Sequence, residues 1–85
     1  MTIVISTVPT TWRRPVHLLI GDIASEPVHN SYEALAYLHN RWPTDQGHYF
    51  QAAKFVCRQS INGTATAELA REAFISAAIE ADIVT

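Results

Sequence analysis

The feature that most limits how this chain can fold is its single cysteine, Cys57, in a sequence of 85 residues. A chain this short buries only about 60–65% of the surface that it exposes when unfolded, so its margin of stability is thin. Short domains commonly add disulfides, a metal or a partner subunit to make up the difference. One cysteine excludes an internal disulfide, and no cluster of cysteine and histidine residues offers a structural metal site. We therefore expect a homodimer.

Composition and charge exclude several classes of protein. The chain is 48% hydrophobic and 16% charged, which is typical of one folded domain. Its formal net charge is −2, and neither half is basic enough for a nucleic-acid binder. No apolar run approaches the ~20 residues that a membrane span needs. Residues 1–8 are apolar but lack the basic start of a signal peptide, so we expect a cytoplasmic location.

The first third of the sequence predicts a β-hairpin. The run Val16–Ile20 is rich in β-forming residues and is closed by the turn pair Gly21-Asp22. Val28-His29 is expected to be the centre of a short second strand. Pro27 suits an edge position there, because proline cannot donate to a strand ladder. A hairpin alone is marginally stable, so it must pack against helices.

Three helices are predicted after the hairpin, over about residues 31–42, 47–61 and 64 or 66 to 81. Asn30 is expected to cap the first helix, with Glu33 in the position of a capping box. Pro43 is expected to stop that helix at the preceding residue. Asn62-Gly63 is expected to stop the second, because glycine adopts the left-handed conformation at low steric cost.

The apolar stripes of the three helices predict one common core. It is expected to include Leu35, Leu38, Trp42, Ala53, Cys57, Phe74 and Ala77. Ile83-Val84 could end the chain as a short third strand or as an ordered tail. The predicted fold class is therefore α+β, with an N-terminal β-hairpin packed on three helices. Residues 1–14 are expected to form an extended arm, and residues 15–85 the single domain.

The stretch from Trp12 to Ala81 resembles the DUF982 family of short bacterial proteins of unknown function, which come mainly from rhizobia. The residues that carry this resemblance are Pro15-Val16, Ala34-x-x-x-Leu38, Trp42-Pro43, Gly47, Ala53-x-x-x-Cys57, Gly63 and the run from Ala70 to Ala81. The resemblance implies a small cytoplasmic α+β domain of bacterial origin and implies no activity. The chain departs from the family pattern at Asp82, near which members often have a glycine.

The residues that could support catalysis or metal binding are more simply explained as structural. Cys57 lies in the middle of a predicted helix on its apolar stripe, which is typical of a small buried hydrophobic residue. The histidines are scattered without the spacing of a zinc site, at His17, His29, His39 and His48. His48 could form an acid–base pair only with Asp45, which is more simply a helix cap. We expect no metal, no cofactor and no enzymatic activity.

One candidate ligand site combines Arg71, Trp42 and His48. Arg71 borders the alanine stripe of the third helix, where it could pair with Glu68, clamp a loop carboxylate or carbonyl, or hold an anionic ligand. Trp42 could be the floor of an aromatic pocket, although a core position is commoner. This site is the basis of the alternative hypothesis, a domain that binds a small ligand or an anion.

A second candidate surface is apolar. Ile75 and Ile79 lie roughly opposite the alanine stripe of the third helix, beside Leu69 and the off-stripe Phe55 of the second helix. If the hairpin does not cover them, these side chains form an exposed patch of the kind that marks an interface. The leading hypothesis is therefore a non-enzymatic interaction or regulatory module, as a homodimer or with another protein partner.

Overall fold

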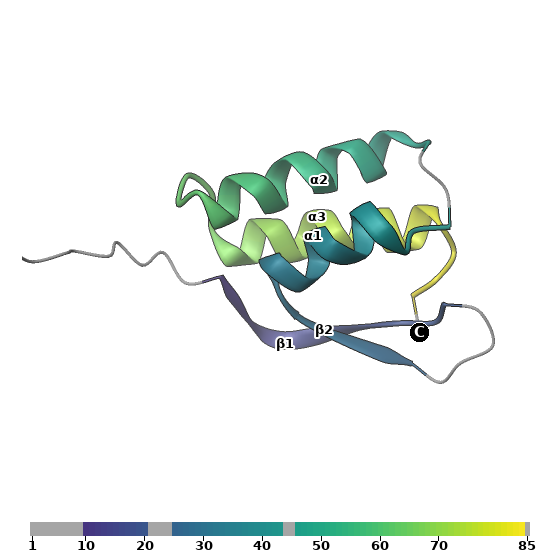
Figure 1. Ribbon diagram of the computed structural model, residues 1–85. Coiled ribbons are helices and arrows are strands. Elements are labelled where there is room, and N and C mark those ends of the chain that lie inside the picture. Colours follow the sequence, from purple (N-terminus) through teal and green to yellow (C-terminus); the bar gives the residue numbers. More distant parts are fainter. Residues whose placement is uncertain (1–9, 21–24, 44–45, 85) are drawn as a thin grey trace, which may run out of the picture.

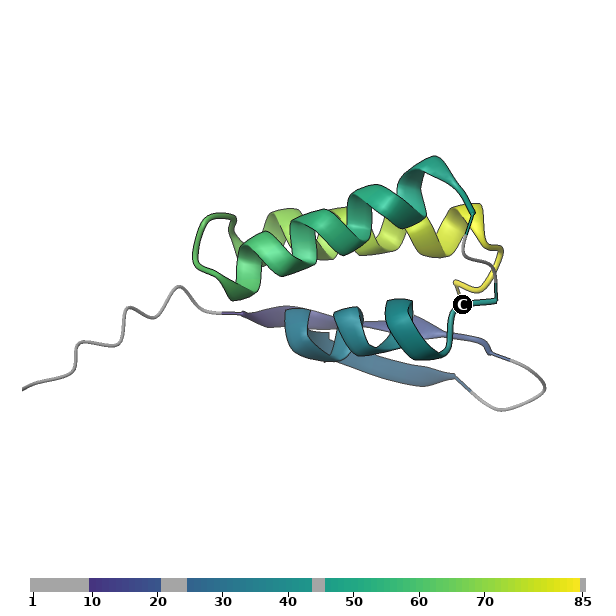
Figure 2. The same cartoon turned by 45° about the horizontal axis from the view of Figure 1, so that its top comes forward.

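Two strands and three helices follow one another in the computed structural model, which describes residues 10–20, 25–43 and 46–84. The elements are β1 (Thr11–Leu18), β2 (Glu26–Asn30), α1 (Ser31–Asn40), α2 (His48–Ile61) and α3 (Ala67–Glu80). The hairpin forms one layer and the helices lie on one of its faces (Figure 1). α1 packs on β2, α3 packs on β1, and α2 packs on both helices (Figure 2). The predicted α+β class and order of elements are confirmed.

The first strand begins earlier than the sequence pattern predicts. β1 starts at Thr11, five residues before the predicted run, and Leu19 and Ile20 lie beyond its end. The strand pairs antiparallel with β2. From the pair Thr11–Asn30 to the pair Val16–Val28, β1 advances by five residues and β2 by only two. β1 therefore carries an irregular segment between Thr11 and Val16. Residues 1–9 of the predicted arm lie outside the described residues.

Backbone N–H donors on both edges of the hairpin are either missing or already bonded, which hinders the addition of another strand. On β2, Pro27 has no N–H, and the N–H of His29 donates to Glu33 Oε1 at 2.8 Å. Beyond the end of β1, the N–H of Leu19 donates to the carbonyl of Ile83 at 2.7 Å. Occupied or missing donors are a common protection against edge-to-edge pairing of sheets.

The helix boundaries follow the predicted start and stop signals closely. Asn30 caps α1 and Thr66 caps α3, each by accepting a hydrogen bond from a backbone N–H three residues ahead. Gly63, with φ +87°, follows the cap of α2 in the left-handed conformation. α1 ends at Asn40, so the prediction that it continues to Trp42 was two residues too long.

The end of α3 turns the chain back into the core. Asp82 adopts φ +60°, and the N–H of Ile83 then donates to the carbonyl of Ala78 at 3.0 Å. This is the Schellman arrangement, in which glycine is the usual residue at the left-handed position. Val84 makes only an isolated bridge with Leu18. The C-terminal strand that the sequence suggested is therefore not formed by the described residues.

The core joins the helix-covered face of the hairpin to all three helices. Its buried apolar residues are Trp12, Val16, Leu18, Val28, Ala34, Leu38, Phe50, Ala53, Cys57, Ala70, Phe74, Ala77, Ala78 and Ile83. Five of the seven predicted core residues are among them. Leu35 and Trp42 are only partly buried, because they lie at the margin of this core. No helix within the described ranges is long and apolar enough to cross a membrane.

Candidate anion-binding site

Trp12 anchors the first half of β1 to the helices. Its side chain is only 5% exposed, and its ring lies 5.4 Å from that of Phe74 on α3. The indole Nε1–H donates to Ser31 Oγ at 3.4 Å, and Ser31 Oγ lies 2.9 Å from Ser60 Oγ. Buried polar groups require hydrogen-bond partners. Here the indole bonds to one buried hydroxyl, and the two hydroxyls bond to each other. The start of β1 is thus fixed to α1, α2 and α3.

Arg13 and Arg14 follow this anchor within the irregular segment of β1. In a regular strand, successive side chains point to opposite faces. Extra residues on one strand interrupt that alternation and redirect side chains. Both arginines are exposed here, and both line the same hollow. Neither guanidinium has a hydrogen bond or ion pair with the residues that the structure describes.

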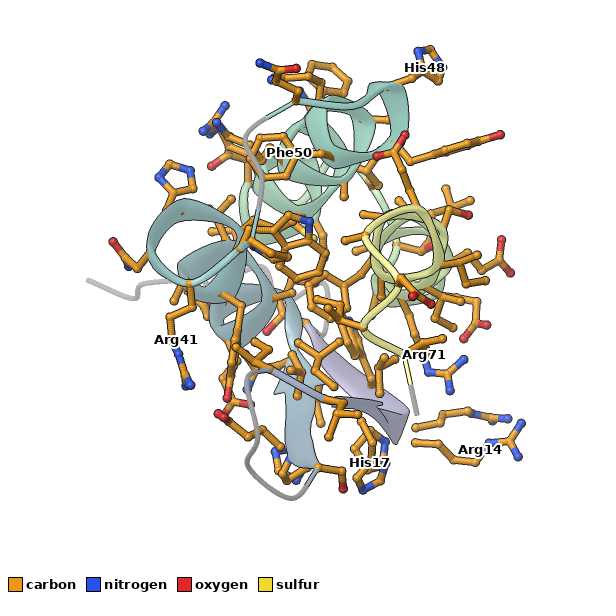
Figure 3. The ribbon with its side chains drawn as sticks, turned by 90° about the vertical axis from the view of Figure 1, so that its right-hand side faces the viewer. Arg14, His17, Arg41, His48, Phe50 and Arg71 are labelled. Carbon is orange, nitrogen blue, oxygen red and sulfur yellow. The ribbon has the colours of Figure 1, made fainter. Side chains whose placement is uncertain are left out.

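Arg71 of α3 closes the site from the other side. Its Nε–H donates to the backbone carbonyl of Arg14 at 2.9 Å. Figure 3 shows the Arg14 and Arg71 side chains close together on the same side of the molecule. The sequence left three roles open for Arg71, and the structure shows the one in which it clamps a carbonyl. A guanidinium has five N–H donors, so this bond leaves the terminal nitrogens available.

The hollow between β1 and α3 has a volume of about 450 Å³ and is lined by Arg13, Arg14, Glu68 and Arg71. These four side chains carry a formal net charge of +2. The whole chain has a formal net charge of −2, so the residues outside the hollow sum to −4. The hollow is therefore a local positive site on a protein that is otherwise acidic.

Trp42 and His48 lie away from this hollow. Trp42 follows α1, and its indole lies 6.4 Å from the Phe50 ring and 5.3 Å from the Phe74 ring. Its Nε1 is buried and has no hydrogen-bond partner among the described residues. His48 is exposed at the first position of α2, and Figure 3 shows its side chain well apart from that of Arg71. The structure does not bring the three predicted ligand residues together in one hollow.

The N-terminus of α2 already holds a carboxylate from the protein itself. Glu80, the last residue of α3, accepts hydrogen bonds from the N–H groups of Tyr49 at 3.3 Å and Phe50 at 3.1 Å. The cap residue is Gly47, which has no side chain to accept them. A negative group suits the positive end of the helix dipole. Glu80 therefore fills the place that an external anion would take. Asp45, the predicted cap and partner of His48, lies outside the described residues.

The predicted apolar surface is divided between exposed and packed side chains. Phe55 is 60% exposed, Leu69 53% and Ile79 60%. Ile75 is only partly exposed and packs against the core. Three of the four predicted side chains are therefore exposed, and Ile75 contributes mainly to packing.

Cys57 and the four histidines lie in different surroundings, because the cysteine is buried and the histidines are exposed. Cys57 is fully buried, and burial raises the pKa of its thiol to about 12, so the thiol is protonated at neutral pH. His29, in β2, has its Nδ1 3.2 Å from Oε1 of Glu33 in the first turn of α1. No group of three or more potential metal ligands is found over residues 10–20, 25–43 and 46–84.

Two residues of the hollow were not predicted as site residues. Arg13 and Arg14 fell within the predicted arm of residues 1–14, in a segment that has the proline content of a turn. The signal that could have identified them is a pair of adjacent arginines directly after a tryptophan. Trp12 is apolar and buried, and the two arginines that follow it in the chain are both exposed.

Comparisons with known proteins agree with the fold. The profile of the family described as "Protein of unknown function (DUF982)" matches residues 14–85. A search of curated proteins found no match. Among solved structures, the chain is similar to the NMR structure of the Agrobacterium tumefaciens protein Atu1219, with 29% sequence identity and a TM-score of 0.76, over 89% of this chain and 76% of that one. The resemblance seen in the sequence is confirmed, and this chain belongs to the DUF982 family.

Proposed function

We propose that this domain is a non-enzymatic binding module, and that its principal site holds an anionic group at Arg13, Arg14 and Arg71. The observation that carries the proposal is the hollow that three arginines from two elements, β1 and α3, line together. Arginine is suited to this role because its planar group presents paired N–H donors to carboxylate or phosphate oxygens.

The arrangement of the arginines supports binding over a purely structural role. Arg71 is held by the carbonyl of Arg14, so its terminal nitrogens are oriented before a ligand arrives. Binding groups that are ordered in advance lose less conformational entropy on binding. Arg13 and Arg14 are exposed, and no described residue neutralises them by an ion pair. Three positive charges in one hollow repel one another, and an anion relieves this repulsion.

Inorganic phosphate is the first probe for this site. We expect weak binding to the wild-type protein, with a Kd on the order of 1 mM at low salt. In a two-dimensional NMR titration, the largest shifts should appear at residues 13, 14, 68 and 71. Added salt should weaken binding, because the site is open to solvent and its charges are screened.

Charge-matched variants separate a site from general attraction. Replacing Arg13 and Arg14 by glutamine should abolish measurable binding and leave the fold intact, since neither guanidinium bonds to a described residue. The control replaces Lys54 and Arg58 on α2 by glutamine, which removes the same charge elsewhere. An equal loss of affinity in both double variants, or no phosphate-induced shifts in the wild type, would reject the proposal.

A second candidate function is self-association, which the exposed side chains of Phe55, Leu69 and Ile79 favour. The occupant of this surface would be a second copy of the chain, since a short domain without a disulfide gains stability from a partner subunit. Light scattering over a range of concentrations should show a dimer. Replacing Leu69 and Ile79 by glutamate should give a folded monomer, because both side chains are more than half exposed. A wild-type protein that stays monomeric at millimolar concentration would contradict this second function.

A further inference from the structure

We propose that the arginine hollow selects a phosphate monoester that carries a hydroxyl or ammonium donor beside its phosphate group. This inference rests on the proposed anion-binding function and names the chemistry of the ligand. It comes from the fourth side chain of the hollow, Glu68, which an unselective anion site would lack.

The charge of the hollow matches a dianion. Three arginines and one glutamate give a formal net charge of +2. A phosphate monoester carries about −1.5 to −2 at pH 7, whereas a carboxylate carries only −1. Its three terminal oxygens can each accept hydrogen bonds, so one phosphate can engage more than one guanidinium. A phosphate monoester is thus the small anionic group that best fits both the charge and the donors.

Glu68 then sets a second requirement. The glutamate lies in the first turn of α3, three residues before Arg71, and forms no ion pair with a described arginine. An ionised carboxylate can only accept hydrogen bonds. Beside a bare phosphate it would face a second negative charge with no donor between them. A ligand with a hydroxyl or ammonium group next to its phosphate supplies that donor and turns a repulsive neighbour into a binding contact.

The size of the hollow leaves room for such a group. Its volume of about 450 Å³ lies within the range of small-molecule sites, about 300–1,000 Å³. A water molecule occupies about 30 Å³ of liquid, so a lone phosphate would fill only a fraction of the hollow. Glu68 lines the same hollow as the arginines, so an organic group attached to the phosphate has room to lie beside the carboxylate.

Three phosphate monoesters test this selection. Ethyl phosphate and phosphoethanolamine differ by a terminal ammonium group, and glycerol 3-phosphate offers hydroxyl donors instead. At pH 8 each phosphate is a dianion, because its second pKa is about 6. We expect the wild-type protein to bind phosphoethanolamine or glycerol 3-phosphate about 5–10 times more tightly than ethyl phosphate, which corresponds to the typical net contribution of one hydrogen bond. Comparing the two donor-bearing probes shows whether ammonium or hydroxyl is preferred.

The variant Glu68→Gln completes the test. It removes the repulsion, so ethyl phosphate should bind several times more tightly than to the wild type, and the preference for donor-bearing probes should shrink to less than twofold. The control is Glu72→Gln, an exposed residue one turn further along α3 that does not line the hollow. It should leave the preference unchanged.

The outcomes distinguish this inference from the proposed function. If no phosphate probe shifts the signals of residues 13, 14 and 71, the anion site itself is rejected. If all three probes bind equally and Glu68→Gln changes nothing, the site stands and the selection by Glu68 is overturned. Tighter binding of ethyl phosphate to the wild type, or an equal effect of Glu72→Gln, would also overturn it.

Discussion

Replacing Gly47 by alanine should be among the most destabilising single-methyl changes in this domain. Gly47 has φ +130° and ψ 140°, a conformation that residues with a side chain rarely adopt. Backbone strain of this kind costs about 1–3 kcal/mol. An added Cβ would also lie 2.3 Å from Glu80 Oε1 and 2.7 Å from its Cδ, so the carboxylate would have to move.

Moving the carboxylate removes the cap of α2. Loss of a helix N-cap costs about 0.5–2 kcal/mol. With the strain, we expect Gly47→Ala to lower the free energy of unfolding by about 2–4 kcal/mol, a large part of the 5–15 kcal/mol typical of a domain. Urea denaturation followed by circular dichroism should show a lower midpoint with an unchanged slope.

A double-mutant cycle tests whether the glycine and the carboxylate act together. Glu80→Ala alone should cost about 1 kcal/mol, because the N–H groups of Tyr49 and Phe50 lose their acceptor. In the Gly47→Ala background the cap is already displaced, so Glu80→Ala should cost almost nothing. The double variant should therefore be about 1 kcal/mol more stable than additivity predicts. If the two costs simply add, Glu80 does not lie over Gly47 and the reasoning is refuted.

Two further predictions concern titratable groups. Cys57 should resist alkylation in the native protein at neutral pH and react quickly in guanidinium, because burial raises its pKa to about 12; fast native labelling would contradict its burial. Bidentate hydrogen bonds from Arg41 at 2.6 and 2.8 Å, and then the Tyr37 hydroxyl, lower the pKa of Glu26 below its ordinary value of 4.5. The contribution of the ionised Glu26 side chain to stability should be present above about pH 4.5 and lost as the pH falls through its lower folded-state pKa. Glu26→Gln should therefore flatten the acid side of a curve of stability against pH. An unchanged curve would show that the Glu26–Arg41 pair contributes nothing.

The elements that could be predicted from the sequence are those whose signals are local. Asn30, Thr66 and Gly63 mark helix ends through their own side chains or backbone freedom, and the structure places the helix boundaries next to them. The apolar stripes of α2 and α3 repeat at the helical period over 14 residues each, so their buried faces were predictable.

The features that could not be predicted depend on contacts between distant residues. The cap of α2 comes from Glu80, about 30 residues away in the sequence, which no local pattern around the start of α2 indicates. Trp42 was expected to be a nearly buried core anchor at the end of α1, but the helix ends two residues earlier and the indole lies at the margin of the core. In both cases tertiary packing decides among options that the local pattern leaves open.

The arginine hollow lies where the sequence lacks the alternating pattern of a strand, and for that reason the sequence did not predict it. The alternating pattern of a strand is broken at Arg13 and Arg14, so this segment was assigned to an arm in place of a strand. In a regular strand one of the two arginines would point toward the core, where an unpaired charge is costly. The extra residues of β1 avoid this and let both side chains line the same hollow. Arg71 then reaches the segment from a position 57 residues away. The irregularity that obscures the strand in the sequence is thus the same one that gathers the charges of the site.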